Sequence, residues 1–228
     1  MTGSRWDDPV VLAGTRRMLE ERARLLAQGE GTVGWKLGFG APTWLEKFGL
    51  AGPLVGFLPT SRVTTSGAHV SCEGWVNPVA EPEIALYLGI DVDDPDLAGE
   101  AIAAVGPAIE LADVDTPPED IGEVLAGNIF HRGVVLGAPR PFEGSVAGMR
   151  ARITKSGSVV ADTQELEALT GGIASILGHV AGLLLAVGER LRVGDVVIAG
   201  SVVPPIPVQP GDHVTFELAP LPPISVRV

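Results

Sequence analysis

Cysteine is almost absent from this 228-residue sequence, since Cys72 is the only one. A single cysteine cannot form an intramolecular disulfide, which favours a reducing compartment, and we expect Cys72 to be a buried, inert thiol. The first residues also lack the basic and then apolar order of a secretion signal, because Trp6, Asp7 and Asp8 stand there. Both features predict a cytoplasmic protein.

Basic residues are few, and no long hydrophobic run is present. Lys and Arg number 16 against 28 Asp and Glu, which gives a formal net charge of −12. Without a cluster of Lys and Arg, the sequence argues against nucleic acids and anionic membrane surfaces as partners. The longest apolar stretch, residues 173–187, is too short and too often interrupted to span a bilayer. We therefore expect a small-molecule partner, with no nucleic acid and no membrane.

Hydrophobic residues make up 46% of the chain, and the 30 glycines and 19 prolines fall between short apolar runs. This spacing predicts a strand-rich fold with many turns. Residues 7–28 and 173–187 are exceptions, because their apolar residues recur at helical spacing. We expect one cooperative α+β unit, with a small N-terminal helical and α/β part at 1–66 packed on a β-rich catalytic body at 67–228.

Alternating or short apolar runs bounded by glycine and proline predict the strands of this body. Two shorter segments, 41–49 and 121–125, have the pattern of helical turns. A hairpin is expected around the sequence Lys-Ser-Gly-Ser, which separates two of the runs. The expected strands are 34–38, 54–58, 76–88, 105–111, 134–136, 149–154, 159–161, 196–199, 214–218 and 224–228.

Two glutamates interrupt the apolar run at 76–88, VNPVAEPEIALYL. Because successive strand residues point to opposite faces, Glu81 and Glu83 share one face, where a cation between them would relieve their repulsion. Another apolar run carries a third acid, Glu110. Carboxylate ligands favour Mg²⁺, Mn²⁺ or Ca²⁺ over zinc. The alternative is that these acids are solvated or ion-paired on exposed faces, as most charged residues are.

Lys36 lies between apolar neighbours and glycines in the short strand 34–38. Glycines allow another group to approach the backbone closely, so Lys36 is a candidate site residue. The local sequence equally allows its ammonium group to reach solvent.

Five stretches stand in one order along the chain: GWKLG at 34–38, AEPEIALYLG at 80–89, VGPAIELAD at 105–113, GNIFHRGVVLG at 127–137 and LRVGDVVIAGSVVPPIPVQPGDHV at 191–214. Together they resemble the 2-keto-4-pentenoate hydratase and 4-oxalocrotonate decarboxylase group of the fumarylacetoacetate hydrolase superfamily. The resemblance covers most of the chain and implies a mixed, β-roll-like fold of the fumarylacetoacetate hydrolase C-terminal type. It also implies assembly into homo-oligomers, with a complex with a related decarboxylase or hydratase as a further form of assembly.

Carried over by position, the resemblance implies that Glu81, Glu83 and Glu110 hold a divalent metal, usually magnesium, with manganese as an alternative. In such enzymes a 2-oxo acid chelates the metal through its C1 carboxylate and C2 oxygen, which stabilises the enolate. Lys36 matches the active-site lysine, which would orient the substrate carboxylate or carry a proton. Ser201 matches a position near the substrate that would donate a hydrogen bond.

The resemblance also implies substrate contacts from Leu58 and Asn128, and one departure from its pattern concerns catalysis. Hydratases of this group carry an acidic pair just after the strand that ends at Leu58, where this chain has Pro59-Thr60-Ser61. His131 or Glu46 would have to replace the missing acid as the group that activates water. Otherwise the reaction is not hydration.

We therefore expect a metal-dependent lyase of aromatic catabolism, a hydratase that adds water to a 2-hydroxy-2,4-dienoate to give a 4-hydroxy-2-oxo acid. The first alternative is a decarboxylase or carbon–carbon hydrolase of a 2-oxo acid or diacid, because the same enolate chemistry serves both. Decarboxylation needs no water-activating acid. The second alternative is a non-catalytic partner subunit that has kept the fold.

Overall fold

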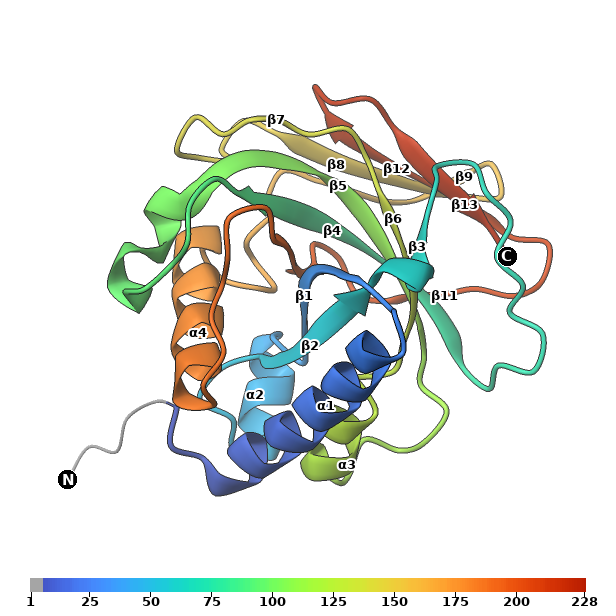
Figure 1. Ribbon diagram of the computed structural model, residues 1–228. Helices are drawn as coiled ribbons and strands as arrows, with labels where there is room; N and C mark the ends of the chain where they lie inside the picture. The colour runs from blue at the N-terminus through green and yellow to red at the C-terminus, as the bar shows by residue number, and fades with distance from the viewer. Residues whose placement is uncertain (1–5) are drawn as a thin grey trace.

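The computed structural model describes residues 6–228, and its largest element is a strongly curved mixed sheet (Figure 1). The strand pairs β1–β10 and β3–β6 are parallel, and the central pair β4–β5 is antiparallel and long. Two short strands lie outside the main strand order: β11 (Ile206–Pro207) pairs with β4, and β7 (Arg140–Pro141) pairs with β5. The order is β2 (Leu54–Pro59), β1 (Thr32–Gly38), β10 (Val196–Ser201), β4 (Pro78–Leu88), β5 (Ile102–Asp113), β6 (His131–Leu136) and β3 (Val63–Thr64).

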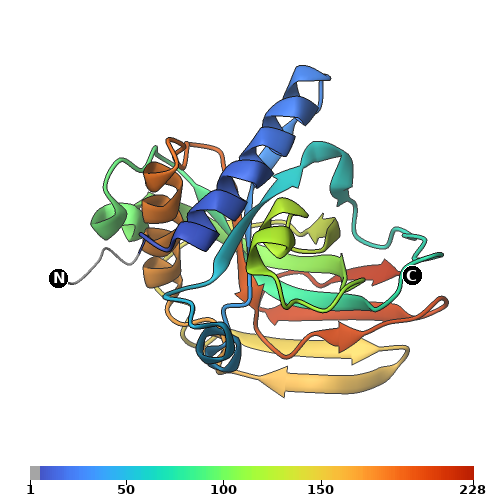
Figure 2. The ribbon, with the colours of Figure 1, turned by 90° about the horizontal axis from the view of Figure 1, so that it is seen from below.

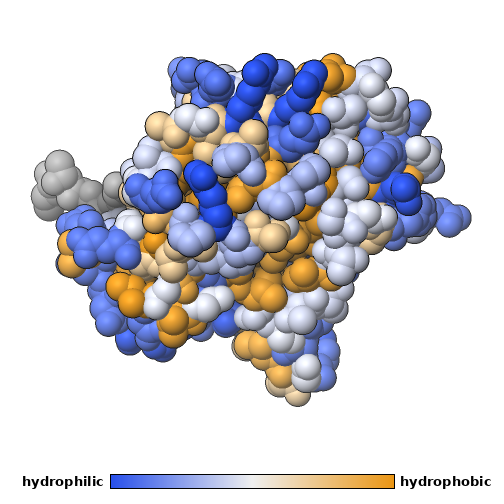
Figure 3. Space-filling view, turned by 90° about the horizontal axis from the view of Figure 1, so that it is seen from above, coloured by the Kyte–Doolittle hydropathy of each residue, from blue (hydrophilic) through white to orange (hydrophobic). Residues whose placement is uncertain are grey.

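A second sheet of four antiparallel strands packs above the first, and Figure 3 shows its side of the molecule, where apolar and polar residues are mixed. Its hairpin turns at Ser156 and Gly157, which have φ angles of 48° and 86°. Asn and Gly are the usual residues for such left-handed turn positions, and Gly157 follows that preference. The strand order is β13 (Ile224–Arg227), β12 (His213–Ala219), β8 (Arg150–Lys155) and β9 (Ser158–Thr163).

Side chains along β4 point alternately to the two faces of the sheet, which separates the main hydrophobic core from the glutamates Glu81 and Glu83. Ile84, Leu86 and Leu88 belong to the large hydrophobic cluster on one face, whereas Glu81 and Glu83 have the opposite parity. A smaller cluster continues the carboxylate face of the curved sheet. Its members are Leu58, Ala85, Ala108, Val134, Val196 and Ile198, all buried.

The helices pack around the ends and one side of the curved sheet (Figures 1 and 2). α1 (Pro9–Ala27) begins at Asp8, whose carboxylate accepts a hydrogen bond from the Val10 N–H at 2.8 Å. It packs against α3 (Ile121–Ala126), and Gly14 permits the close approach, because a Cβ there would lie 2.9 Å from the Leu125 Cβ. The other elements of this kind are α2 (Pro42–Phe48), α4 (Ile173–Ala186) and the short 3₁₀ helices η1 (Thr60–Arg62) and η2 (Pro95–Ala101).

The α+β prediction is confirmed, and both amphipathic segments are helices, α1 and α4. Cys72 is a buried free thiol, as expected. The sheet is continuous across residue 66, because β1 pairs with β10 and β2 pairs with β1; residues 1–5 of the predicted N-terminal part lie outside the described residues. Among residues 6–228, no helix is long and apolar enough to cross a membrane.

Candidate metal centre and active site

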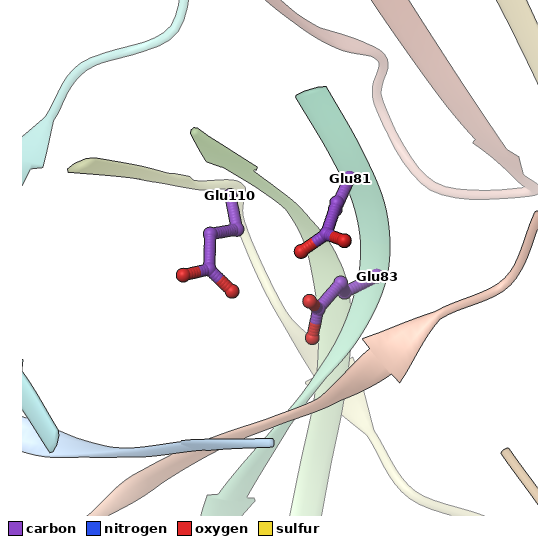
Figure 4. A group of neighbouring side chains, drawn as sticks. All are labelled: Glu81, Glu83 and Glu110. Atoms are coloured by element: carbon purple, nitrogen blue, oxygen red, sulfur yellow. The ribbon is translucent and has the colours of Figure 1, made fainter. Parts of the chain in front are cut away.

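Three carboxylates from two neighbouring strands converge on one point (Figure 4). Glu81 and Glu83 extend from β4, and Glu110 lies on β5 directly opposite Glu81 in the antiparallel register. One oxygen of each carboxylate lies within 4.8 Å of the other two. The predicted trio is therefore assembled by adjacent strands, in a geometry that one cation can bridge.

Two of the carboxylate oxygens are buried and have no hydrogen-bond donor among residues 6–228. Glu83 Oε2 accepts a hydrogen bond from the Gly200 N–H at 2.7 Å, but the buried Glu83 Oε1 has no partner. Glu110 Oε2 is also buried without one. Unpaired anionic oxygens in the interior are strongly unfavourable, so this donor set fits a hard divalent cation.

Burial and mutual repulsion shift the ionisation of the β4 pair. Burial first, and then the charge of Glu110, raise the pKa of Glu81 to about 7. The same two causes, with repulsion from Glu81 added, raise the pKa of Glu83 well above its usual value. Without a cation, both carboxylates therefore favour protonation more than free glutamate does.

Lys36 is buried at the same centre and does not extend to solvent, since its relative exposure is 1%. Its Nζ lies 2.5 Å from Glu110 Oε1 and donates a hydrogen bond to the Ile129 carbonyl at 3.0 Å. Burial alone would raise the pKa of Glu110, but the Lys36 ammonium and the His131 hydrogen bond hold it below its usual value. Glu110 therefore favours ionisation more than free glutamate does, in contrast to Glu81 and Glu83.

The curvature of the sheet brings Lys36 to Glu110. Strands β1 and β5 are separated by β10 and β4, a span of about 14 Å in a flat sheet with strands about 4.8 Å apart. The register places Lys36 beside Ile198, Ile198 beside Ala85, and Glu110 beside Glu81, all on one face. The Lys36–Glu110 ion pair therefore lies on the concave side.

His131 is the second buried partner of Glu110. Its Nδ1 lies 2.8 Å from Glu110 Oε1, and its buried Nε2 has no partner. Burial lowers the pKa of His131 below its usual value, although Glu110 opposes this shift. A neutral ring that donates its Nδ1–H to Glu110 leaves Nε2 as an acceptor, and the contact orients the carboxylate.

A left-handed turn carries the groups that surround Lys36. Asn128, Ile129 and Phe130 have φ angles of 57°, 52° and 61°, a conformation that costs about 1–2 kcal/mol for each L-residue. The Asn128 amide stabilises the turn, because its Oδ1 accepts from the Phe57 N–H at 2.8 Å and its Nδ2 donates to the Phe57 carbonyl at 2.9 Å. The turn directs the Ile129 carbonyl to Lys36.

The other predicted site residues lie at different depths. Ser201 is half-buried beside the carboxylates, and its hydroxyl donates to the Pro82 carbonyl at 3.3 Å. Leu58 is fully buried in the small cluster on the concave face. Thr60 and Ser61 are exposed in η1, and Glu46 is exposed on α2. Of these residues, Ser201 alone lines a chamber described below.

Two adjoining chambers open at Glu81, with volumes of about 190 and 210 Å³. They share the wall residues Gly38, Phe39, Trp44, Glu81 and Pro205. The smaller, which we name the Lys36 chamber, is completed by Lys36, Ala112, Val114, Pro118, Ile129 and Phe130. The larger, the Ser201 chamber, is completed by Leu37, Gly40, Ala41, Thr43, Pro53, Leu169, Thr170, Ile176, Ala199, Gly200, Ser201, Val203 and Pro204.

Aromatic wall residues were missed in the sequence. The ring centroid of Phe39 lies 5.5 Å from that of Trp44 and 6.4 Å from that of Phe130, in edge-on and tilted contacts. The available signal was Gly38-Phe39-Gly40 directly after the Lys36 strand, since glycines flank an aromatic residue with a φ of 59°. Phe130 comes from a distant segment, which only the tertiary structure brings to this wall.

Comparison with known proteins agrees with this geometry. Residues 45–228 match the family model described as fumarylacetoacetate hydrolase C-terminal. A 4-oxalocrotonate decarboxylase of Pseudomonas sp. is 27% identical over 203 residues, 86% of this chain and 78% of the relative. A 2-hydroxyhexa-2,4-dienoate hydratase of Comamonas testosteroni is 28% identical over 197 residues, 82% of this chain and 74% of the relative.

A solved structure has the same fold. The 4-oxalocrotonate decarboxylase from Pseudomonas putida G7, complexed with magnesium and adipate, superposes with a TM-score of 0.84 and 26% sequence identity. The match covers 92% of this chain and 82% of that one. These findings confirm the predicted family and fold. The relatives that resemble this chain are hydratases and decarboxylases. The chain belongs to the fumarylacetoacetate hydrolase family and is an enzyme.

Proposed function

We propose that this protein is a Mg²⁺-dependent lyase, with Mn²⁺ as a substitute ion, that acts on a short 2-oxo acid or its 2-hydroxydienoate enol. The observation that carries the proposal is the cluster of Glu81, Glu83 and Glu110, in which two buried oxygens lack donors beside a buried lysine. The solved decarboxylase complexed with magnesium supports the choice of ion.

The three glutamates would hold the ion, and Gly200 would keep Glu83 in position through its N–H. A bound Mg²⁺ would supply a Lewis acid for a 2-oxo acid's carboxylate and C2 oxygen. Glu110 would contact the protein and the ion with different oxygens. Its Oε1 already contacts Lys36 and His131, and its Oε2, which has no partner, would bind the ion. His131 would fix the orientation of that carboxylate.

Lys36 is the proposed proton carrier and substrate-orienting residue. An ammonium group has three N–H donors, and Glu110 Oε1 and the Ile129 carbonyl occupy two of them. Because Lys36 also lines a chamber, the third donor is available to the substrate. Lys36 would hold the substrate carboxylate or deliver a proton to the carbon end of the dienol. Ser201, at the edge of the other chamber, would donate a hydrogen bond through its hydroxyl.

Hydration is the first candidate reaction. Protonation of the dienol gives an unsaturated ketone, and conjugate addition of water at C4 then gives a 4-hydroxy-2-oxo acid. The support comes from the relatives named 2-hydroxyhexa-2,4-dienoate hydratase and 2-keto-4-pentenoate hydratase. The buried Nε2 of His131 is the acceptor that would take the proton from water, in place of the acid that this chain lacks after β2.

Decarboxylation is the second candidate, and one observation favours it. In the part of the chain that the structure describes, Glu81 is the only carboxylate that lines the two chambers, and the residues after β2, Thr60 and Ser61, are exposed. Loss of CO₂ from a 2-oxo diacid needs no water-activating base. The relatives named 4-oxalocrotonate decarboxylase support this candidate.

The test is turnover of 2-hydroxypenta-2,4-dienoate and of 4-oxalocrotonate by the purified protein, with Mg²⁺ and with chelator, followed by ultraviolet absorbance and product analysis. A 4-hydroxy-2-oxo acid product supports hydration, and CO₂ release supports decarboxylation. Silence on both substrates supports a non-catalytic partner subunit. Calorimetric titration of Mg²⁺ into Glu81→Ala completes the test, because unchanged binding there would refute the metal site.

The proposal extends to the assembly and location of the protein. We expect a homo-oligomer in the cytoplasm, and a complex with a related decarboxylase or hydratase is the alternative assembly. Light scattering of the purified protein measures the oligomeric state, and the same measurement on a mixture with such an enzyme detects the complex.

A further inference from the structure

The two chambers carry almost no charge away from the metal centre. Among the described residues 6–228, Lys36 and Glu81 are the only charged residues that line the Lys36 chamber, and Glu81 is the only one that lines the Ser201 chamber. Both of these charges belong to the end of the site where the carboxylates converge. The walls farther from that end offer rings, aliphatic groups, glycines and a few hydroxyls.

Lys47 is the cation on the helix that carries Trp44, but it is not among the residues that line the chambers. It is exposed on α2, and its Nζ lies 4.9 Å from the ring centroid of Trp44 and 5.2 Å from that of Phe48. Trp44 and Phe48 stack with centroids 5.7 Å apart and an interplanar angle of 5°. The ammonium is therefore held by the aromatic faces and is not among the chamber walls.

The aromatic wall is built into the backbone at two points. Phe39 has a φ of 59° between two glycines, and Phe130 has a φ of 61° at the end of the left-handed turn. Both rings pack together and line the Lys36 chamber with Val114 and Ile129. The wall that these two rings form with Val114 and Ile129 is apolar, which suits an uncharged substrate tail.

From these observations we infer that the site selects 2-oxo acids that carry a single carboxylate and an uncharged, apolar tail, and that Phe39, Trp44 and Phe130 determine this selectivity. The inference rests on the proposed function, which supplies the head-group contacts. A second carboxylate at the far end of the substrate would lie against these apolar walls with no cation among them, and an anion that loses water without gaining an ionic partner is disfavoured. Dicarboxylic substrates are therefore disfavoured, in contrast to the adipate bound by the solved decarboxylase. Of the two candidate reactions, hydration of a monoacid is then favoured over decarboxylation of a 2-oxo diacid.

The test compares two probes of equal length that lack the C3–C4 double bond and so cannot be hydrated. These are 2-oxohexanoate, with a methyl terminus, and 2-oxohexanedioate, with a carboxylate terminus. Their binding to the Mg²⁺-loaded protein is measured by isothermal calorimetry at pH 8. We expect the Kd of the monoacid to be at least tenfold lower, a difference of about 1.4 kcal/mol.

Adding a cation to the chamber should reverse the preference. Val114→Arg places a guanidinium on the wall of the Lys36 chamber, and we expect at least tenfold tighter binding of 2-oxohexanedioate than in the wild type. Val114→Gln is the matched control, since it adds a polar side chain without charge and should not improve diacid binding. Thr43→Arg tests the Ser201 chamber in the same way and shows which chamber holds the tail. Melting temperatures confirm that each variant is folded.

The outcomes separate this inference from the proposed function. Equal or tighter binding of the diacid by the wild-type protein overturns the inference and leaves the proposed function standing. If neither acid binds although Mg²⁺ does, the proposed function fails, and the inference fails with it. Tighter diacid binding by Val114→Gln as well as Val114→Arg also overturns the inference, because charge would not be the cause.

Discussion

Replacing Glu81 by Gln should stabilise the metal-free protein at alkaline pH and abolish its stabilisation by Mg²⁺. Glu81 has a pKa of about 7 in the folded protein against an ordinary value of 4.5. A raised pKa means that folding favours the protonated form. The contribution of Glu81 to stability is therefore fully present below pH 4.5 and is lost as the pH rises through 7.

The magnitude follows from the difference between these pKa values. A shift of one unit corresponds to about 1.4 kcal/mol, so ionised Glu81 costs roughly 3 kcal/mol of folding free energy at pH 8. Gln has nearly the same shape and cannot ionise, so it escapes this cost. For a chain of this size, 3 kcal/mol corresponds to a rise in Tm of roughly 6–12 °C. At pH 5 the two proteins should differ little.

The assay is urea unfolding in the presence of chelator at pH 5 and pH 8, repeated at pH 8 with excess Mg²⁺. Glu217→Gln is the control, because Glu217 is exposed on β12, away from the metal centre. The wild-type protein should gain stability from Mg²⁺, whereas Glu81→Gln should not. A variant that is less stable than the wild type at pH 8 in chelator would refute the argument from burial, and one that still responds to Mg²⁺ would refute the ligand assignment.

Three further predictions concern the groups around the carboxylates. Lys36→Met should lower kcat by about 100-fold, because the proton carrier is lost, while circular dichroism shows an intact fold. A nearly normal kcat would mean that Lys36 has a structural role only. Asn128→Ala should cost about 1–3 kcal/mol in urea unfolding, because it leaves the buried Phe57 backbone groups unpaired, and unchanged stability would contradict that reading. Removal of metal by chelation should abolish turnover, and Mg²⁺ or Mn²⁺ should restore it in a titration; activity that persists in chelator would contradict a metal-dependent reaction.

Local patterns in the sequence were sufficient for much of the fold. The heptad-like apolar pairs predicted α1, and the period of two along 76–88 predicted that Glu81 and Glu83 face the same way. These predictions succeed because helix and strand periodicities depend only on neighbouring residues. The ordered motifs that resemble the hydratase and decarboxylase group added Glu110 and Lys36 to the candidate site.

The roles of other candidate residues depended on contacts between distant segments. The resemblance implied that Asn128 binds substrate, but both polar atoms of its amide contact the Phe57 backbone, and its role at the substrate stays a prediction. Leu58 lies deep on the concave face, where it packs among apolar side chains. Neither contact has a local signal, because each depends on which strands and turns meet.

The sequence by itself determined the two long helices, the main strands, the shared face of Glu81 and Glu83, and the resemblance to this family, but not the short strands β3, β7 and β11. Only the tertiary structure decided that Glu110 lies opposite Glu81, that Lys36 is buried against Glu110, and that an uncharged aromatic wall closes the site. The physical reason is that side-chain direction along a strand is a local property, whereas strand register, sheet curvature and the meeting of loops are properties of the whole chain.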